Sequence, residues 1–362
     1  MSYITAIGTA NPPYRFSQVL LADFMTRAMQ LDPSDSRRLR TIFRASGIEH
    51  RYTVLEDYGR SGDYSFFPNT PGLEPFPSTG ERLHVFREHA LGLSVAAVQN
   101  MNKNLRDVTH LIVVCCTGMY APGLDIELVG KLKLRSTVQR TSITFMGCYA
   151  AFNALKVADA FCCQDKQAKV LIVCTELCSL HFQKEATEDN LLANALFADG
   201  AAAVLVEADR TSSPSLKLEA FYNDLAPEGA GDMAWSIGDL GFEMKLSSYV
   251  PEIIKRGIGD LTQTLLQKIS RPMTGIRYFA IHPGGRKILE TIEQVLGIEK
   301  ERNYAAYEVL KNYGNMSSPT VLFVLQEIFK KLQGKDHDEF ILSFAFGPGL
   351  TLESMLLKIQ TN

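Results

Sequence analysis

A single cysteine stands where an expected strand passes into an expected helix. The β-branched and aromatic run at 143–146 leads into Gly147, and an uninterrupted apolar helical pattern begins directly after Cys148. A thiol at a helix N-terminus lies close to unpaired backbone amides and to the positive end of the helix dipole, which favour the thiolate. Cys148 is therefore predicted to be a nucleophile, and the alternative interpretation is a buried core cysteine.

Two other polar residues occupy positions suited to assist a nucleophile. His282 ends the apolar run 276–281 and precedes a Pro-Gly-Gly sequence, so its side chain is expected in a crevice rather than in the core. Asn315 lies in the turn 313–319 before a helix. Each could instead be structural, as a core histidine and as a helix cap. With Cys148 they predict a thiolate whose charge the imidazole balances, and two donors for one developing oxyanion.

Alternating patterns predict the elements that carry these residues. Short, fully apolar, β-branched runs alternate with helical patterns, which is typical of sheets covered by helices on both faces. The clearest strands are expected at 110–117, 169–175 and 199–206. The polar segment 209–215 interrupts the alternation, and a second series of strands and helices follows it. The chain is therefore expected to be an α/β protein built from two similar halves.

Three segments fit this alternation less well. Residues 58–82 are rich in Gly, Pro, Ser and Phe, and an irregular excursion of this length is usually functional or mobile. A loop rich in Gly, Ala and Asp is expected after the strand 216–221 and before a helix over 250–268. The helix near Ser34 carries four arginines, which form either a solvated face or a grip for an anionic substrate.

Composition places the chain among ordinary globular proteins. Of its 362 residues 46% are hydrophobic and 21% are charged, and the formal net charge of −3 gives no argument for nucleic acid or an acidic membrane surface as a partner. The first residues lack the pattern of a signal peptide, and no apolar run reaches the roughly 18 residues of a transmembrane helix. Seven cysteines without a CxxC pair predict neither a disulfide framework nor a zinc site, and favour a reduced, cytoplasmic compartment.

Six motifs occur in the order that one enzyme family shows. They are Ile7–Pro13, Gly147–Ala150, Ala195–Ala202, Ile281–Gly285, Tyr313–Pro319 and Phe346–Thr351. On these motifs, spread over nearly the whole chain, the sequence resembles the type III polyketide synthases, the chalcone synthase-like branch of the thiolase superfamily. The resemblance implies a homodimer with a thiolase-like fold and a duplicated five-layer αβαβα core. The half 1–210 would carry the nucleophile, and the half 211–362 the histidine and the asparagine.

The resemblance also implies a reaction. Cys148 would take an acyl group from a starter acyl-CoA as a thioester, and malonyl-CoA would then bind and lose CO2. His282 and Asn315 would stabilise the resulting enolate oxygen while the enolate attacks the thioester in a Claisen condensation. Further rounds and cyclisation would follow. No metal or redox cofactor is implied, because decarboxylation delivers the carbanion without a strong base and the site needs oxyanion donors above all.

Further residues match positions that the family uses around its substrates. Phe197 matches the gate between the CoA tunnel and the cavity, and Ser317 is expected near the thiol. Gly349 lies in the loop that shapes the cyclisation cavity in the family. Where plant members send a methionine across the dimer interface, this chain has Ala121.

The basic cluster that binds CoA in the family is only partly matched. Arg38 falls on one of its positions, whereas Thr41 and Ala45 occupy others. Arg40 and Arg44 are expected to substitute from one turn away, because a guanidinium pairs well with phosphate.

Several cavity positions depart from the plant chalcone synthases. The differing residues are Met244 for a second gate phenylalanine, Trp235 for a glycine, and Cys116, Cys178 and His181 for small hydroxyl residues. The segment 235–242 is similar to that of bacterial members that accept fatty acyl starters. We therefore expect a medium or long fatty acyl starter and an alkylpyrone or alkylresorcinol product.

Three alternative functions are open on the sequence. A ketoacyl-carrier-protein synthase III-like enzyme shares the Cys-His-Asn set but takes a carrier-protein thioester. A papain-like cysteine hydrolase also uses Cys, His and Asn, yet it is expected to have an export signal and a different surround of the thiol. A non-catalytic subunit of the same fold would usually lack the thiol that this chain keeps as Cys148.

Overall fold

One nine-stranded sheet organises the molecule. The computed structural model describes residues 1–361. In the first half of the sheet the order is β1 (Tyr3–Ala10), β7 (Asp199–Glu207), β6 (Lys169–Leu177), β4 (His110–Cys115) and β5 (Gln139–Thr144). The second half continues from β1 with β8 (Ser215–Leu225), β13 (Thr351–Gln360), β12 (Phe340–Gly347) and β11 (Ile276–Ile281). Strands β1 and β8 pair only at Tyr3 and Ile4, so the two halves diverge beyond this short seam.

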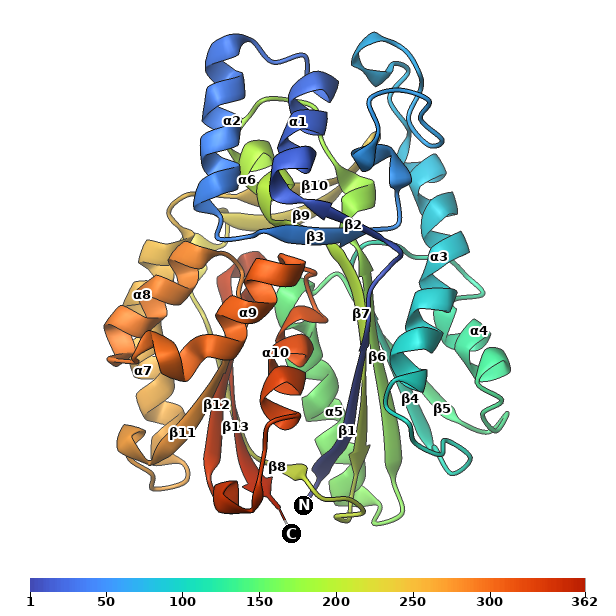
Figure 1. Ribbon diagram of the computed structural model, residues 1–362. Helices are drawn as coiled ribbons and strands as arrows, with labels where there is room; N and C mark the ends of the chain where they lie inside the picture. The colour runs from blue at the N-terminus through green and yellow to red at the C-terminus, as the bar shows by residue number, and fades with distance from the viewer. Residues whose placement is uncertain (362) are drawn as a thin grey trace.

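Helices fill the space between the two halves of the sheet and cover their outer faces (Figure 1). The inner helices are α5 (Ala150–Gln164) and α10 (Thr320–Phe329), and each packs against strands of both halves. The outer helices are α3 (Thr79–Gln99) and α4 (Leu124–Lys131) on one side, and α7 (Val250–Gln267) and α8 (Arg286–Leu296) on the other. Helix α10 is apolar and buried almost all round, as an inner helix must be. The expected five-layer, thiolase-like α/β fold is confirmed. No helix in residues 1–361 has the length and apolar character needed to cross a membrane.

The strands differ in burial as their sequences predict, with one exception. Strands β4, β6 and β7 are buried nearly throughout, which agrees with their uninterrupted apolar runs. Strand β5 instead lies at the edge of the sheet and alternates between exposed and half-buried residues. It ends at Thr144, so the strand that was expected to reach Met146 gives way to a turn two residues earlier.

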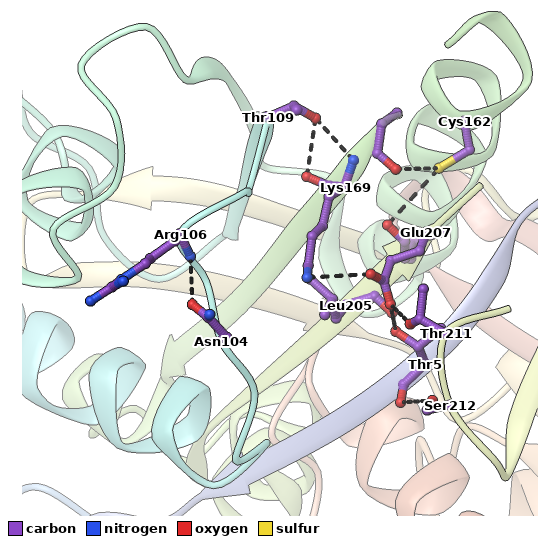
Figure 2. Close-up of polar contacts among 12 residues, drawn as sticks. Thr5, Asn104, Arg106, Thr109, Cys162, Lys169, Leu205, Glu207, Thr211 and Ser212 are labelled. Atoms are coloured by element: carbon purple, nitrogen blue, oxygen red, sulfur yellow. Dashed lines mark hydrogen bonds and ion pairs between the residues drawn. The ribbon is translucent and has the colours of Figure 1, made fainter. Parts of the chain in front are cut away.

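Polar contacts fix the end of the sheet where β1 begins and β7 ends (Figure 2). The Lys169 ammonium lies 3.3 Å from the Glu207 carboxylate, and the hydroxyls of Thr5 and Thr211 donate hydrogen bonds to the same carboxylate. Thr109 donates to the Lys169 carbonyl oxygen and accepts from the Lys169 N–H. Each of these five residues is therefore bonded to another residue of the group.

A cap of small elements covers the opposite end of the sheet (Figure 1). It contains α1 (Gln18–Ala28), α2 (Pro33–Ala45), α6 (Glu188–Leu196) and the two-stranded sheet of β2 (Tyr14–Ser17) with β3 (His50–Thr53). A hairpin, β9 (Met233–Gly238) with β10 (Gly241–Leu246), occupies the segment that was expected to be a loop. Sequence patterns missed these four strands, and the β9–β10 hairpin forms a wall of the site described below.

The segment expected to be an irregular excursion is also ordered. The Asp57 carboxylate accepts hydrogen bonds from the N–H groups of Ser65, Phe66 and Phe67, each at 2.8 Å. Aromatic rings from this segment pack with rings of the cap, among them Tyr58 with its centroid 4.8 Å from that of Phe24. The segment ends at Ser78 rather than at residue 82, because the Ser78 side chain caps α3 together with Glu81.

Candidate active site

Cys148 is held in a tight turn between β5 and α5. Phe145 and Gly147 have left-handed backbones, with φ of 57° and 74°. A Cβ on Gly147 would lie 2.3 Å from Cδ of Pro348, so only glycine fits there. A short 3-10 turn over Gly147–Tyr149 precedes α5, so the sulfur lies before the first α-helical turn rather than within it.

One enclosed cavity brings together the three residues proposed from the sequence. Cys148, His282 and Asn315 all line it, although they come from the start of α5, the end of β11 and the turn before α10. Other predicted substrate-contacting residues line the same cavity, namely Cys116, Cys178, Phe197, Trp235, Met244 and Ser317. We call it the catalytic cavity.

Three of the predicted site residues do not line the catalytic cavity. Gly349 lies in the expected loop with φ of 74°, but Phe346 and Pro348 supply the lining atoms. Ala121 is exposed in the loop between β4 and α4. Arg38 lies outside, in a surface groove described below.

The His282 imidazole is buried without a hydrogen-bond partner. The residue is 1% exposed, and neither ring nitrogen has a partner within residues 1–361. Its backbone is fixed, because its N–H donates to the Phe344 carbonyl oxygen at 2.8 Å. Burial lowers the pKa of His282 to about 3, so the ring is neutral at physiological pH. A neutral imidazole presents one N–H donor and one acceptor nitrogen to the cavity.

Burial also sets the pKa of the Cys148 thiol. Desolvation raises the pKa of Cys148 to about 12, against opposing hydrogen bonds from Ser317 and Asn315. The expected resting thiolate is therefore wrong, because burial outweighs the helix N-terminus, which begins beyond the sulfur. The sulfur lies 3.9 Å from Asn315 Oδ1, to which the thiol donates a long hydrogen bond. The resting site pairs a neutral thiol with a neutral imidazole.

The Asn315 amide is oriented by a neighbouring backbone group. Its Oδ1 accepts a hydrogen bond from the Ser317 N–H at 2.8 Å, and Ser317 has a left-handed backbone with φ of 58°. Its Nδ2 donates only a long bond of 3.4 Å, to the Gly284 carbonyl oxygen. The Nδ2 group can therefore turn to a stronger acceptor, such as an oxyanion, at little cost.

The backbone of Asn315 is paired with the residues on both sides of Phe197. The Asn315 N–H donates to the Leu196 carbonyl oxygen and the Ala198 N–H donates to the Asn315 carbonyl oxygen, both at 2.9 Å. The gate and the amide donor thus share one rigid backbone bridge. Sequence reasoning treated these residues separately, because a bridge between segments so far apart in the chain leaves no local pattern.

Glu176 is a buried carboxyl group that the sequence reasoning missed. It accepts hydrogen bonds from the hydroxyls of Ser318 and Thr117, at 2.6 and 2.7 Å, and from the Cys116 N–H at 2.9 Å. Burial raises its pKa. One acid within the apolar strand β6 is a visible sequence signal, since such a residue must be paired inside the protein.

A second cavity lies behind a partition of four residues. Cys178, Phe197, Trp235 and Met244 line both this side cavity and the catalytic cavity. The side cavity extends under the cap, where Leu21, Met25, Phe182, Ala193, Arg51 and Asn194 line it.

The partition is built from the missed hairpin. Trp235 and Met244 face each other across β9 and β10, and the Trp235 indole donates to the Cys116 carbonyl oxygen at 2.8 Å. The His181 ring stacks on Phe242 with centroids 4.1 Å apart and donates to the Thr117 carbonyl oxygen at 2.7 Å. These contacts fix the bulky wall that the sequence predicted at Trp235.

A basic groove on the surface borders the catalytic cavity. Leu246, Gly284 and Ile288 line both. The positively charged residues of the groove are Arg37, Arg38, Arg286 and Lys287. Arg38 lies 3.8 Å from Glu188 across the groove.

The predicted substitutes in the basic cluster lie elsewhere. Arg40 forms an ion pair with Asp23, and Arg44 donates to the Arg40 carbonyl oxygen. Neither lines the groove as the structure describes it, whereas Arg37 does. The structure therefore gives Arg40 and Arg44 other partners, and their substitution for the CoA-binding residues stays a prediction.

The sequence matches one enzyme family along its length. The profile of the N-terminal domain of chalcone and stilbene synthases matches residues 1–210, and that of their C-terminal domain matches residues 217–360.

Similar proteins carry polyketide synthase names. "Alpha-pyrone synthesis polyketide synthase-like Pks18" of Mycobacterium tuberculosis is 28% identical, over 99% of this chain and 91% of that protein. "Probable polyketide synthase 1" of Dictyostelium discoideum is 30% identical over 99% of this chain, which spans only 11% of that relative. The crystal structure of the C-terminal type III polyketide synthase domain of Steely1, a type I/III hybrid from Dictyostelium, superposes with a TM-score of 0.90 at 28% identity and 99% coverage of both chains. The chain therefore belongs to the chalcone and stilbene synthase family and is a type III polyketide synthase, an acyl-transferring condensing enzyme.

Proposed function

We propose that Cys148 accepts an acyl starter from acyl-CoA and that malonyl-CoA extends it by decarboxylative Claisen condensation. The observation that carries this proposal is the enclosed cavity where Cys148 meets His282 and Asn315. The basic groove supports CoA thioesters as substrates, because Arg37, Arg38 and Lys287 can bind phosphates at the entrance.

In the loading step the His282 imidazole acts as general base. As the sulfur attacks the starter carbonyl carbon, its proton passes to the acceptor nitrogen of the neutral ring. The tetrahedral intermediate then collapses with cleavage of the bond to CoA sulfur, and the CoA thiolate takes this proton. Burial keeps the ring neutral and so leaves one nitrogen open as a proton acceptor. The same burial makes the imidazole a weak base, so the proton moves to it only as the sulfur bonds to the starter carbonyl carbon.

In the extension step the donors of His282 and Asn315 stabilise one oxyanion. Malonyl-CoA loses CO2, and the electrons of the broken C–C bond move into the thioester carbonyl to form an enolate. The imidazole N–H and Asn315 Nδ2 donate to the enolate oxygen. The enolate carbon then attacks the acyl carbon on Cys148, and the sulfur leaves as the chain passes to CoA. Each donor is worth about 3 kcal/mol in a site of this kind.

We further propose a medium or long fatty acyl starter and an alkylpyrone or alkylresorcinol product. An acyl chain on Cys148 can pass the partition at Met244 and Cys178 into the largely apolar side cavity. Methionine supports this route, because its flexible side chain can move aside where a second gate phenylalanine would resist. The pyrone-related name of the mycobacterial relative points to the same product class.

The oligomeric state and the cellular compartment of the enzyme are also proposals. Family resemblance favours a homodimer in the cytoplasm, with the exposed Ala121 near the interface. Sedimentation at several protein concentrations would test the dimer, and a monomer at every concentration would contradict it.

Mass spectrometry of the products tests the proposed reaction. Purified protein receives malonyl-CoA with hexanoyl-, lauroyl- or benzoyl-CoA, and Cys148→Ala is the control. Pyrones or resorcinols from the fatty starters, absent with Cys148→Ala, are expected. A preference for benzoyl-CoA would overturn the fatty starter. No extension from any CoA, together with activity on malonyl-carrier protein, would instead favour a ketoacyl-carrier-protein synthase III-like enzyme.

A further inference from the structure

Arg51 is a buried cation beside the gate residue. It is 4% exposed; its Nε donates to Gln18 Oε1 at 2.9 Å, and its Nη1 donates to the Phe197 carbonyl oxygen at 2.5 Å. Gln18 in turn donates from Nε2 to the Ala195 carbonyl oxygen at 2.7 Å. Two carbonyl groups of the segment 195–197 are therefore held by one connected pair of side chains from β3 and α1.

The aliphatic part of Arg51 packs against the residue that precedes Asn315. A Cβ on Gly314 would lie 2.9 Å from Arg51 Cγ and equally close to the Leu196 carbonyl oxygen. Gly314 also has φ of 69°, so glycine is required on both counts. Arg51 therefore contacts Phe197 on one side of the bridge and Gly314, the residue before Asn315, on the other.

We propose that Arg51 is a positioning residue that holds Phe197 and Asn315 in one fixed relation. The inference rests on the roles proposed above for these two residues. The bridge hydrogen bonds of 2.9 Å on either side of Phe197 transmit any shift of its segment to the backbone of Asn315. A displacement of about 1 Å in a positioned group can lower a rate by about 100-fold. Arg51 thus acts on decarboxylation through Asn315, because it lines the side cavity and not the catalytic cavity in which malonyl-CoA reacts.

The guanidinium geometry is what the position requires. Burial lowers the pKa of Arg51 to about 10, so the group stays charged at neutral pH. The nearby Asp199 carboxylate is occupied by hydrogen bonds from Ser179 and from the Val54 N–H. A lysine would keep the charge, but its single ammonium cannot reproduce the planar fork that reaches Gln18 and Phe197 together.

The test compares Arg51→Lys with Arg82→Lys. Arg82 is a matched control, because it is also buried and its hydrogen bonds go to other backbone carbonyls, those of Pro77, Leu180 and Phe182. Two rates are measured for each variant: alkylation of Cys148 by iodoacetamide, and release of radiolabelled CO2 from malonyl-CoA.

Arg51→Lys is expected to slow CO2 release by about tenfold or more, with alkylation within about twofold of the wild type. Alkylation is expected to change less than CO2 release, because β5 and α5 position Cys148 and its sulfur makes only a long hydrogen bond of 3.9 Å to Asn315. Arg82→Lys should lower the melting temperature but leave the ratio of the two rates unchanged. The same ratio in both variants, or wild-type CO2 release by folded Arg51→Lys, would overturn the inference.

A second variant keeps the test decisive if Arg51→Lys does not fold. Gln18→Met removes the hydrogen bonds to Arg51 and to the Ala195 carbonyl oxygen while keeping a similar volume. It should slow CO2 release by about threefold, again without slowing alkylation; unchanged CO2 release would contradict the inference. Failure of the proposed function is distinguishable, because Asn315→Ala would then leave CO2 release unchanged as well.

Discussion

Glu207 and His282 are buried polar groups at opposite ends of the sheet, and they differ in their partners. At one end Glu207 is 7% exposed and has Lys169, Thr5 and Thr211 as partners (Figure 2). At the other end His282 is 1% exposed, and its ring nitrogens lack partners within the described chain. A buried polar group without a partner lowers stability, so it persists where something other than stability maintains it. Glu207 therefore stabilises the fold, whereas the His282 ring is available to bind a substrate oxygen.

The sharpest test of this comparison removes the unpaired groups. His282→Ala and Asn315→Ala should each lower the rate of polyketide formation by about 100- to 1,000-fold, because each removes an oxyanion donor. The melting temperature should fall less with His282→Ala than with Glu207→Ala, since the His282 ring loses packing contacts but no hydrogen bond. Activity is measured by product mass spectrometry and stability by calorimetry. Thr5→Val, at the other end, is the matched control and should keep full activity.

Removing the paired carboxylate should give the reverse pattern. Glu207→Ala leaves Lys169 and two hydroxyls without their acceptor, so the free energy of unfolding should fall by about 2 kcal/mol. The turnover number should stay unchanged, because Glu207 lies at the far end of the sheet. Denaturant unfolding and steady-state kinetics provide the two measurements. Glu207→Gln keeps an acceptor for the two threonine hydroxyls, so its free energy of unfolding should fall less than that of Glu207→Ala. A large loss of activity in either variant without a loss of stability would contradict the comparison.

The unpaired histidine should also make stability depend on pH. The folded-state pKa of His282 is lowered to about 3, whereas an unfolded histidine titrates near its ordinary value of 6.5. Between these values the unfolded state binds the extra proton, so stability falls as pH falls, by up to about 1.4 kcal/mol per pH unit for one group. His181 is lowered in the same way, so it contributes separately. Unfolding measured from pH 7 to pH 4 should show a shallower decline in His282→Ala than in the wild type. Equal slopes would show that His282 is solvated or paired.

The smallest expected effect concerns the side cavity alone. Ala193 lines that cavity and not the catalytic one, so Ala193→Phe should shorten the space for an acyl chain. The ratio of kcat/KM for lauroyl-CoA to that for hexanoyl-CoA should fall about tenfold, while hexanoyl-CoA is used as before. Ala193→Ser is the size-matched control. An unchanged ratio would show that the acyl chain takes another path.

Much of the fold could be predicted because its strands and helices have unambiguous periods. Strands β4, β6 and β7 are uninterrupted apolar runs, and helix α7 lies within one residue of its expected bounds. The hairpin β9–β10 was missed although both strands alternate large apolar residues with small or charged ones, as strands do. The Gly, Ala and Asp residues around 226–232 indicated a loop, and that interpretation was extended over the hairpin. Its packing against His181 and Cys116 comes from distant parts of the chain.

The residues of the site were predicted better than their electrostatics. Motifs located Cys148, His282 and Asn315, and the structure places all three on one cavity. Burial then reversed the expected protonation of the thiol, because desolvation depends on the closed cavity and not on local sequence. The division of the chain at residue 210 stays a prediction. The contacts of Arg51 could not be predicted from local sequence either, because they join four segments that are far apart in the chain.

The short seam between β1 and β8 has a consequence for how the chain folds as it is made. Strand β1 is synthesised before its partners β7 and β8, and Tyr3 pairs with both Glu207 and Lys217. Until the ribosome has delivered these strands, β1 has no strand with which to pair. Pairing so distant in sequence is intrinsically slow. Nascent chains that end before β7 therefore expose an unpaired strand, and in this state the enzyme is most prone to aggregate and most in need of a chaperone.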